Sequence, residues 1–230
     1  MRSRPVVAID GPAGAGKSTV ARRLSSHLGF AFVDTGALYR AVAYAARQAG
    51  VGWDDESGVS AVADRLASNR ALLLVPDPAR GVRVLLDGQD VSDQIREPDM
   101  SMGASRVSAL SGVRAALLDL QRIAGEEGGV VLEGRDIGTV VFPDAEAKFF
   151  LTATPEVRAR RRYDELRARG QNVDYAATLE EVRTRDRKDS TRAISPLRQA
   201  EDAVVIDSTH RTIEEVVDEM AARVLSLGSS

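Results

Sequence analysis

The residues from Gly11 to Ser18 have types and spacing that suit phosphate chemistry. They match the pattern G-x-x-x-x-G-K-[ST] at every position. Glycines let a backbone wrap around an anion and direct N–H groups at it, and a helix that starts at the motif adds its positive end. Lys17 is then expected to reach the β- and γ-phosphates of a nucleotide, and the Ser18 hydroxyl to bind Mg²⁺. The motif predicts a phosphate-binding loop.

Two other interpretations fit this stretch less well. A strand-to-helix turn without a ligand does not require the complete eight-position motif. A dinucleotide-binding turn would use Gly11, Gly14 and Gly16, but their spacing is G-x-x-G-x-G, and that fingerprint makes no use of Lys17 or Ser18. Only three of the 31 basic residues are Lys, so the lysine of the motif stands out in a chain whose positive charges are mainly Arg.

Arginines gather between residues 155 and 198, a stretch that holds 12 basic and 8 acidic residues. Arg158, Arg161 and Arg162 recur at i, i+3 and i+4, which places three guanidinium groups on one side of a helix. Such a charge run is usually a solvated helix face. Guanidinium also matches phosphate geometry, so we expect this trio to face the phosphates of a bound nucleotide.

Residues 133–136 form another charged cluster. It follows an apolar run and is expected at the carboxyl end of a strand, where open α/β sheets bind ligands. The sequence suggests no general base, because His27 and His210 are expected at the ends of a helix and a strand. A hydroxyl acceptor usually needs a base, whereas a phosphate monoester, with a second pKa of about 6, is already anionic at neutral pH. These features favour phosphoryl transfer to a phosphate acceptor.

Short apolar runs alternate with helical periodicity, which predicts a parallel sheet flanked by helices. The predicted strands are 5–9, 30–33, 129–132, 147–151 and 204–206. The predicted helices are 18–28, 37–49, 57–67, 99–109 and 113–125, two stretches between 155 and 192, and a last helix that a cap at 207–209 can open. Residues 70–98 instead read as short hairpins, which predicts an inserted antiparallel β subdomain; two more strands of the main sheet are the alternative.

Composition limits the class of protein. With 230 residues, 43% of them hydrophobic, the chain is expected to form a single domain over 1–230 with insertions. It has no Cys, no apolar run of about 18 residues, and no room for a signal peptide before the first strand. Its net charge of −3 argues against bulk nucleic-acid binding. We expect a cytoplasmic monomer that binds neither nucleic acid nor membrane.

Six segments resemble the bacterial cytidylate kinases, a family of P-loop nucleoside monophosphate kinases. The resemblance runs from about residue 5 to about residue 225, and its Gly-Arg-Asp motif is specific to that family. It implies an α/β fold with a central parallel sheet, an antiparallel subdomain beside the monophosphate site, and an arginine-rich helical lid at 155–172. It also implies transfer of the γ-phosphoryl group of ATP to CMP or dCMP, with Mg²⁺. The matching segments are 6–18, 34–40, 134–144, 185–189, 192–196 and 207–209.

The resemblance also implies roles for individual residues. It assigns the acceptor phosphate to Arg40, Arg135 and Arg185 beside Thr35, cytosine to Ser105, Arg114 and Asp136, the sugar hydroxyls to Asp189, and closure of the site to Arg192. It assigns ATP to Gly11, Pro12, Ala13, Gly14, Ala15, Gly16, Lys17, Ser18, Thr19, Arg158 and Arg162, and catalysis to Lys17, Arg135, Arg158, Arg161 and Arg185. Where some relatives have Asp before Gly134, this chain has Glu133, a longer side chain expected to meet the metal beside Ser18, directly or through water.

Two other functions also fit the motifs. A different small-molecule P-loop kinase would share the loop and the lid but would need other acceptor residues. A regulatory P-loop ATPase or GTPase that acts on a protein partner would hydrolyse nucleotide without an acceptor. The chain has no N-K-x-D guanine-reading motif, which disfavours a GTPase. Acceptor specificity separates these functions.

Overall fold

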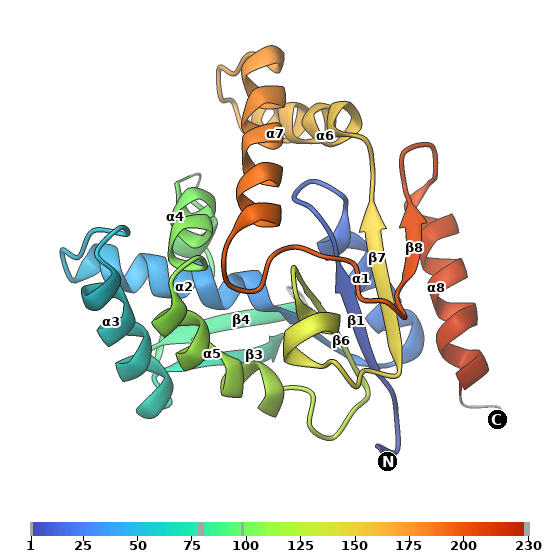
Figure 1. The fold of residues 1–230 in the computed structure, drawn as a ribbon, viewed down its shortest axis with the longest axis horizontal. Coiled ribbons are helices and arrows are strands. Elements are labelled where there is room, and N and C mark those ends of the chain that lie inside the picture. The colour runs from blue at the N-terminus through green and yellow to red at the C-terminus, as the bar shows by residue number, and fades with distance from the viewer. Residues whose placement is uncertain (1, 78–80, 98, 228–230) are drawn as a thin grey trace.

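The computed structural model describes residues 2–77, 81–97 and 99–227. Within them, five parallel strands form a central sheet in the order β2-β6-β1-β7-β8 (Figure 1). The strands are β1 (Val6–Asp10), β2 (Ala31–Asp34), β6 (Val130–Gly134), β7 (Ala147–Thr152) and β8 (Val204–Asp207). The helices are α1 (Lys17–Leu28), α2 (Thr35–Gln48), α3 (Glu56–Ser68), α4 (Met100–Val107), α5 (Ser111–Ile123), α6 (Pro155–Ala168), α7 (Tyr175–Thr191) and α8 (Ile213–Leu227), with short helical turns η1 (Gln94–Arg96) and η2 (Ile137–Val141). The predicted parallel sheet flanked by helices is confirmed.

Both faces of the sheet are covered. Val7 and Ile9 of β1 belong to a core with α1 and α8, whereas Val6 and Ala8 belong to a core with the π-helical turn η2. Successive side chains of a strand point to opposite faces, so the continuous apolar run of β1 contributes to both cores. This burial fixes the strand whose carboxyl end leads into the phosphate loop.

A separate three-stranded antiparallel sheet consists of β3 (Leu72–Asp77), β4 (Gly81–Leu86) and β5 (Gln89–Asp90). It packs through Leu72, Val84 and Leu86 against a cluster that contains residues of α2, α3 and α5. The alternative that these residues add strands to the main sheet is therefore wrong. Residues 78–80 and 98 of the predicted insert lie outside the described residues, and its bounds stay a prediction.

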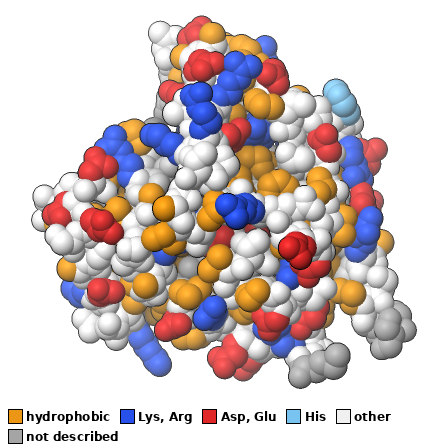
Figure 2. Space-filling model, viewed as in Figure 1, with side chains coloured by type: hydrophobic (Ala, Val, Ile, Leu, Met, Phe, Trp, Pro, Cys, Tyr) orange, Lys and Arg blue, Asp and Glu red, His pale blue; other side chains and the backbone are white. Residues whose placement is uncertain are grey.

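Helices α6 and α7 project beyond the carboxyl end of β7 (Figure 1). Thr154 caps α6 by accepting a hydrogen bond from the Val157 amide at 3.4 Å, and Asp174 caps α7 by accepting one from the Ala177 amide at 2.9 Å. Figure 2 shows both basic and acidic side chains on this projection. The predicted lid at 155–172 takes in α6 and the turn after it, but not α7.

Most element boundaries differ from the prediction by one or two residues, and two of the differences bear on the site. Strand β6 continues to Gly134, so Glu133, which was predicted to follow the strand, lies on the strand itself. Helix α8 begins at Ile213 rather than directly after 207–209. Thr212 and Glu215 form a reciprocal capping box there, since each side chain accepts a hydrogen bond from the other's amide, at 3.2 and 2.8 Å. Across the described part of the chain, every helix falls short of the length and apolarity needed to cross a membrane.

Candidate active site

A cavity of about 600 Å³ opens at the carboxyl ends of β2 and β6, beside the loop that joins β1 to α1. Parallel α/β sheets bind ligands at this edge. Of the residues predicted for the site, the cavity brings together Ala13, Gly14, Ala15, Gly16, Lys17, Ser18, Thr19, Thr35, Arg40, Ser105, Arg114, Glu133, Arg135, Asp136, Arg161, Arg162, Arg185, Asp189 and Arg192. Three other predicted residues do not line it: Gly11, Pro12 and Arg158.

The phosphate loop turns on glycines with positive φ angles, which are 149° at Gly11, 77° at Gly14 and 92° at Gly16. Gly11 is the most constrained of the three, because a Cβ there would lie 2.0 Å from the carbonyl oxygen of Leu151 on β7. We expect Gly11→Ala to lower the free energy of unfolding by roughly 2–5 kcal/mol, through overpacking and positive-φ strain together. Thermal denaturation measures the loss.

Gly50→Ala is the matched control for this change. Gly50 also has a positive φ, of 70°, but a Cβ there meets nothing within 4 Å. We therefore expect only the conformational cost, about 1–2 kcal/mol. Equal losses in the two variants would show that the contact with β7 contributes nothing.

Lys17 and Glu133 form a buried pair under the loop, with exposed fractions of 5% and 4%. The Lys17 ammonium donates a hydrogen bond to the Pro12 carbonyl oxygen at 2.8 Å. Burial, followed by the charge of Arg135, lowers the pKa of Lys17, and the charge of Glu133 opposes that shift. Burial, followed by the charge of Asp34, raises the pKa of Glu133, and the charge of Lys17 opposes that shift. Burial therefore outweighs the attraction between the two groups, and their pairing offsets only part of the cost of keeping both charged.

The surroundings of Glu133 suit a magnesium ion. Its Oε1 atom is buried and has no hydrogen-bond partner among the described residues. The Ser18 hydroxyl lies near enough to its carboxyl group to oppose the rise in the pKa of Glu133. No group of three His, Cys, Asp or Glu side chains in the described part of the chain could hold a metal by itself. Mg²⁺ typically takes one or two carboxylates together with substrate phosphates and water, so these residues fit the ion once a nucleotide is bound.

Three of the arginines that line the cavity are those predicted to bind the acceptor phosphate: Arg40 on α2, Arg135 after β6, and Arg185 on α7. Arg40 donates to Asp34 at 2.5 Å and Arg135 donates to Asp189 at 3.0 Å. The Arg185 Nε atom is buried and has no partner among the described residues. Burial, followed by the charge of Arg135, lowers the pKa of Arg185 to about 10. Cations that disfavour one another in this way favour an anionic ligand.

Asp136 is the centre of a buried polar cluster and is 4% exposed. One of its carboxylate oxygens accepts a hydrogen bond from Arg114, and Oδ1 lies 3.8 Å from the Arg192 Nη2 atom. Arg114 also donates to the Ser108 carbonyl oxygen at 3.2 Å. Ser105 of α4 lines the same cavity. The cluster offers an acceptor and several donors, which is what recognition of a heterocyclic base requires.

The predicted arginine trio of α6 does not act as one set. Arg161 and Arg162 line the cavity, but Arg158 does not. Arg158 is only 3% exposed, and its guanidinium donates to Asp186 on α7 and to the Ala13 carbonyl oxygen. Periodicity placed the three on one helix side but could not show that α7 covers the first of them.

The sequence analysis assigned no role to several residues that line the cavity, among them Asp34 and a segment after β8. Asp34 lies at the end of β2, accepts a hydrogen bond from the Ala37 amide at 3.1 Å, and pairs with Arg40. An Asp directly before a helix is a recognisable cap, so this position carried a signal. Residues 208–216 also contribute to the wall, through Arg211 and Ile213 among others. Ser208 falls in the matching segment 207–209, but no sequence pattern marked Arg211, Thr212, Ile213 or Val216 as part of the site.

Comparison with known proteins gives a consistent result. A family model described as cytidylate kinase matches residues 7–226. A protein of Pelotomaculum thermopropionicum named cytidylate kinase is 53% identical over 224 residues, which cover 97% of each chain. One of Syntrophotalea carbinolica with the same name is 52% identical over 220 residues, or 96% of this chain and 92% of that one. A solved structure of an uncharacterized protein from Eubacterium ventriosum shares the fold, with a TM-score of 0.51, 13% identity, and coverage of 97% and 99%.

Proposed function

This chain belongs to the cytidylate kinase family and transfers the γ-phosphoryl group of ATP to CMP or dCMP, and we propose that the transfer takes place in the 600 Å³ cavity. One observation carries the assignment of the site: the phosphate loop and the three arginines Arg40, Arg135 and Arg185 line the same cavity. Phosphoryl transfer depends mainly on positioning and on neutralising charge, and this arrangement supplies both.

On the donor side, the amide groups of the loop and the positive end of α1 bind the phosphates of ATP. Lys17 exchanges the Pro12 carbonyl oxygen for a phosphate oxygen when the nucleotide binds. Ser18 and Glu133 would hold Mg²⁺, and the ion would neutralise charge that develops on the phosphates. As α6 closes, Arg161 and Arg162 bring further positive charge to the transferring group.

On the acceptor side, Arg40, Arg135 and Arg185 bind the monophosphate and orient one of its oxygens toward the γ-phosphorus. That oxygen is already anionic at neutral pH, so transfer needs no general base. Thr35 lines the phosphate pocket and Asp189 binds the sugar hydroxyls. Substrate phosphate replaces the internal pairing of these arginines with carboxylates such as Asp34.

The remaining assignments concern the base and the surrounding elements. Asp136, Arg114 and Ser105 read cytosine, and Arg192 closes the site over the bound nucleotide. The 155–172 segment acts as the lid and the 70–98 insert borders the acceptor side of a single domain. We also propose that the protein works as a monomer in the cytoplasm, without nucleic-acid or membrane partners.

An assay of ADP release across the common nucleoside monophosphates tests this function. We expect rapid release with CMP and dCMP, little with UMP, AMP or GMP, and almost none when no acceptor is present. Release that does not depend on an acceptor would identify a nucleotide hydrolase instead. Release that depends on a non-nucleotide acceptor would identify a different small-molecule kinase.

A further inference from the structure

Arg158 is the most completely bonded cation near the phosphate loop. Its Nε atom donates to the Ala153 carbonyl oxygen at 2.9 Å, and Nη1 donates to the Ala13 carbonyl oxygen at 3.1 Å. Nη1 and Nη2 also bind the two carboxylate oxygens of Asp186 at 2.9 and 2.6 Å. Guanidinium has five N–H donors, and four of them are used here. Arg158 therefore has one free N–H donor and cannot bind a phosphate in the bidentate manner without first breaking some of these bonds.

These contacts join elements that belong to opposite sides of the reaction. Ala13 lies in the loop that binds ATP, whereas Asp186 lies on α7. On that helix, Asp186 stands between Arg185 and Asp189, the residues assigned to the acceptor's phosphate and sugar. Asp186 itself does not line the cavity. A bidentate Arg–carboxylate pair fixes both distance and orientation, so it can hold α7 in register with the loop.

The bond to Ala13 also affects which backbone groups of the phosphate loop face the nucleotide. The Ala13 carbonyl oxygen accepts a hydrogen bond from Arg158. The Ala15 carbonyl oxygen accepts one from Arg161 and one from the Ser208 hydroxyl, each at 3.3 Å. Carbonyl oxygens repel phosphate, and amide groups attract it. Side chains that draw the carbonyl groups outward therefore leave the loop's amide groups free for the nucleotide.

We propose that Asp186 is a positioning residue that, through Arg158, links the conformation of the ATP-binding loop to the placement of the acceptor-binding residues on α7. The inference rests on the site assignment above. It gives Arg158 the role of a connecting residue in place of a phosphate ligand. ATP that orders the phosphate loop then favours the position of α7 that CMP needs. Likewise, CMP that orders α7 favours the conformation of the loop that ATP needs.

Asp186→Asn tests the connection while leaving one oxygen as an acceptor for Arg158. We expect the KM values for ATP and for CMP both to rise, by roughly five- to tenfold, because the connection reaches both sites. The preference for CMP over UMP should not change, because the base-reading cluster is untouched. Steady-state kinetics with each substrate varied in turn gives all three quantities.

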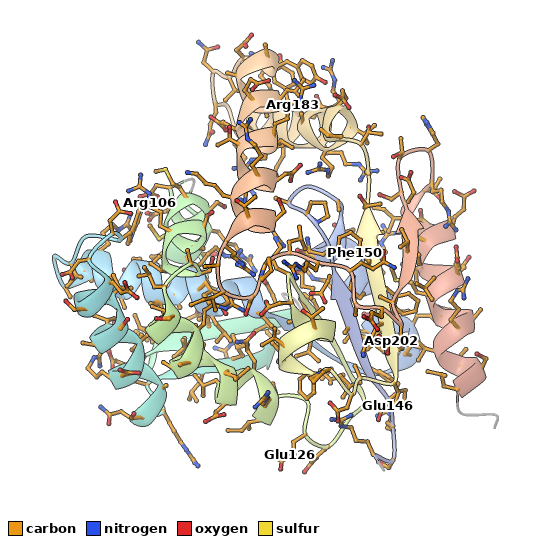
Figure 3. The ribbon with its side chains drawn as sticks, in the orientation of Figure 1. Arg106, Glu126, Glu146, Phe150, Arg183 and Asp202 are labelled. Atoms are coloured by element: carbon orange, nitrogen blue, oxygen red, sulfur yellow. The ribbon has the colours of Figure 1, made fainter. Side chains whose placement is uncertain are left out.

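Glu156→Gln is the matched control. The Glu156–Arg183 pair also joins α6 to α7, with a nitrogen–oxygen distance of 3.0 Å, but both side chains are about half exposed and neither lines the cavity. Figure 3 shows Arg183 among these two helices at the top of the view. Exposed ion pairs contribute little, so both KM values should stay within about twofold of the unsubstituted protein.

Arg158→Lys supplies a second test that does not depend on the stability of the first variant. Lysine keeps the charge facing Asp186 but lacks the planar fork needed to bind its two oxygens and Ala13 together. We expect the same rise in both KM values, and no further rise when Arg158→Lys and Asp186→Asn are combined, because both interrupt one connection.

Two results would overturn the inference. One is a fall in kcat alone for Arg158→Lys that adds to the effect of Asp186→Asn, since this is the behaviour of a phosphate ligand. The other is an active Asp186→Asn protein with unchanged KM values. An unsubstituted protein that does not phosphorylate CMP would instead contradict the proposed function.

Discussion

Replacing Lys17 with Met should lower kcat by about three orders of magnitude, the scale of loss seen when one preorganised charge at a transition state is removed. Lys17 lies at the end of the phosphate loop, and its ammonium is bonded to the Pro12 carbonyl oxygen at 2.8 Å. Methionine has a similar volume and keeps the buried stem packed. The loss should therefore appear in turnover rather than in folding. Initial rates at saturating ATP and CMP, together with a thermal melt, measure the two effects separately.

Lys148→Met provides a matched control. Lys148 is also buried, at 9% exposure, and also donates to a proline carbonyl oxygen five residues earlier, that of Pro143, at 2.6 Å. It pairs with Asp202, which Figure 3 shows beside β7, and it does not line the cavity. We expect a lower melting temperature with kcat nearly unchanged. If Lys17→Met kept kcat within tenfold, the assignment of Lys17 to the transferring phosphoryl group would be wrong.

Replacing Asp136 with Asn should reduce the preference for CMP over UMP by at least tenfold. Cytosine presents an amino donor and a ring-nitrogen acceptor, and uracil reverses both polarities. A buried carboxylate can only accept, so uracil sets its carbonyl against Asp136 and leaves a donor such as Arg114 unpaired. Such mismatches reach roughly 10⁴-fold where polar groups are desolvated, and Asp136 is 4% exposed. An asparagine amide can present either polarity, which relaxes the discrimination.

Asp189→Asn separates base reading from a general disturbance of the acceptor site. Asp189 is also a buried carboxylate that binds an arginine, since it accepts from Arg135 at 3.0 Å, but we assign it to the sugar. Its loss should weaken CMP and UMP alike and leave their ratio of kcat/KM unchanged. Equal kcat/KM values for CMP and UMP in the unsubstituted protein would refute the assignment of Asp136 while leaving phosphoryl transfer intact.

The features predictable from the sequence were those determined by neighbouring residues. The phosphate loop lies within eight consecutive positions, and its glycines, lysine and hydroxyl each have a local chemical reason. The apolar runs of β1 and β6 were recognisable because a strand that is buried on both faces is apolar along its whole length. The family was recognisable because its motifs are short and contiguous. Element boundaries were less predictable, and those of β6 and α8, which bear on the site, depended on where strand pairing and side-chain caps end each element.

Tertiary structure alone decided which charged side chains face the ligand. Periodicity placed Arg158, Arg161 and Arg162 on one side of α6, but Arg158 bonds to Asp186, 28 residues away, while the other two line the cavity. In the same way, Asp136 meets Arg114 from 22 residues away. A guanidinium group binds whichever acceptor the packing of neighbouring elements brings within about 3 Å, and helical spacing carries no information about that neighbour. The sequence therefore determines the chemistry available at this site, and the packing of α6, α7 and the loop determines which arginine supplies it.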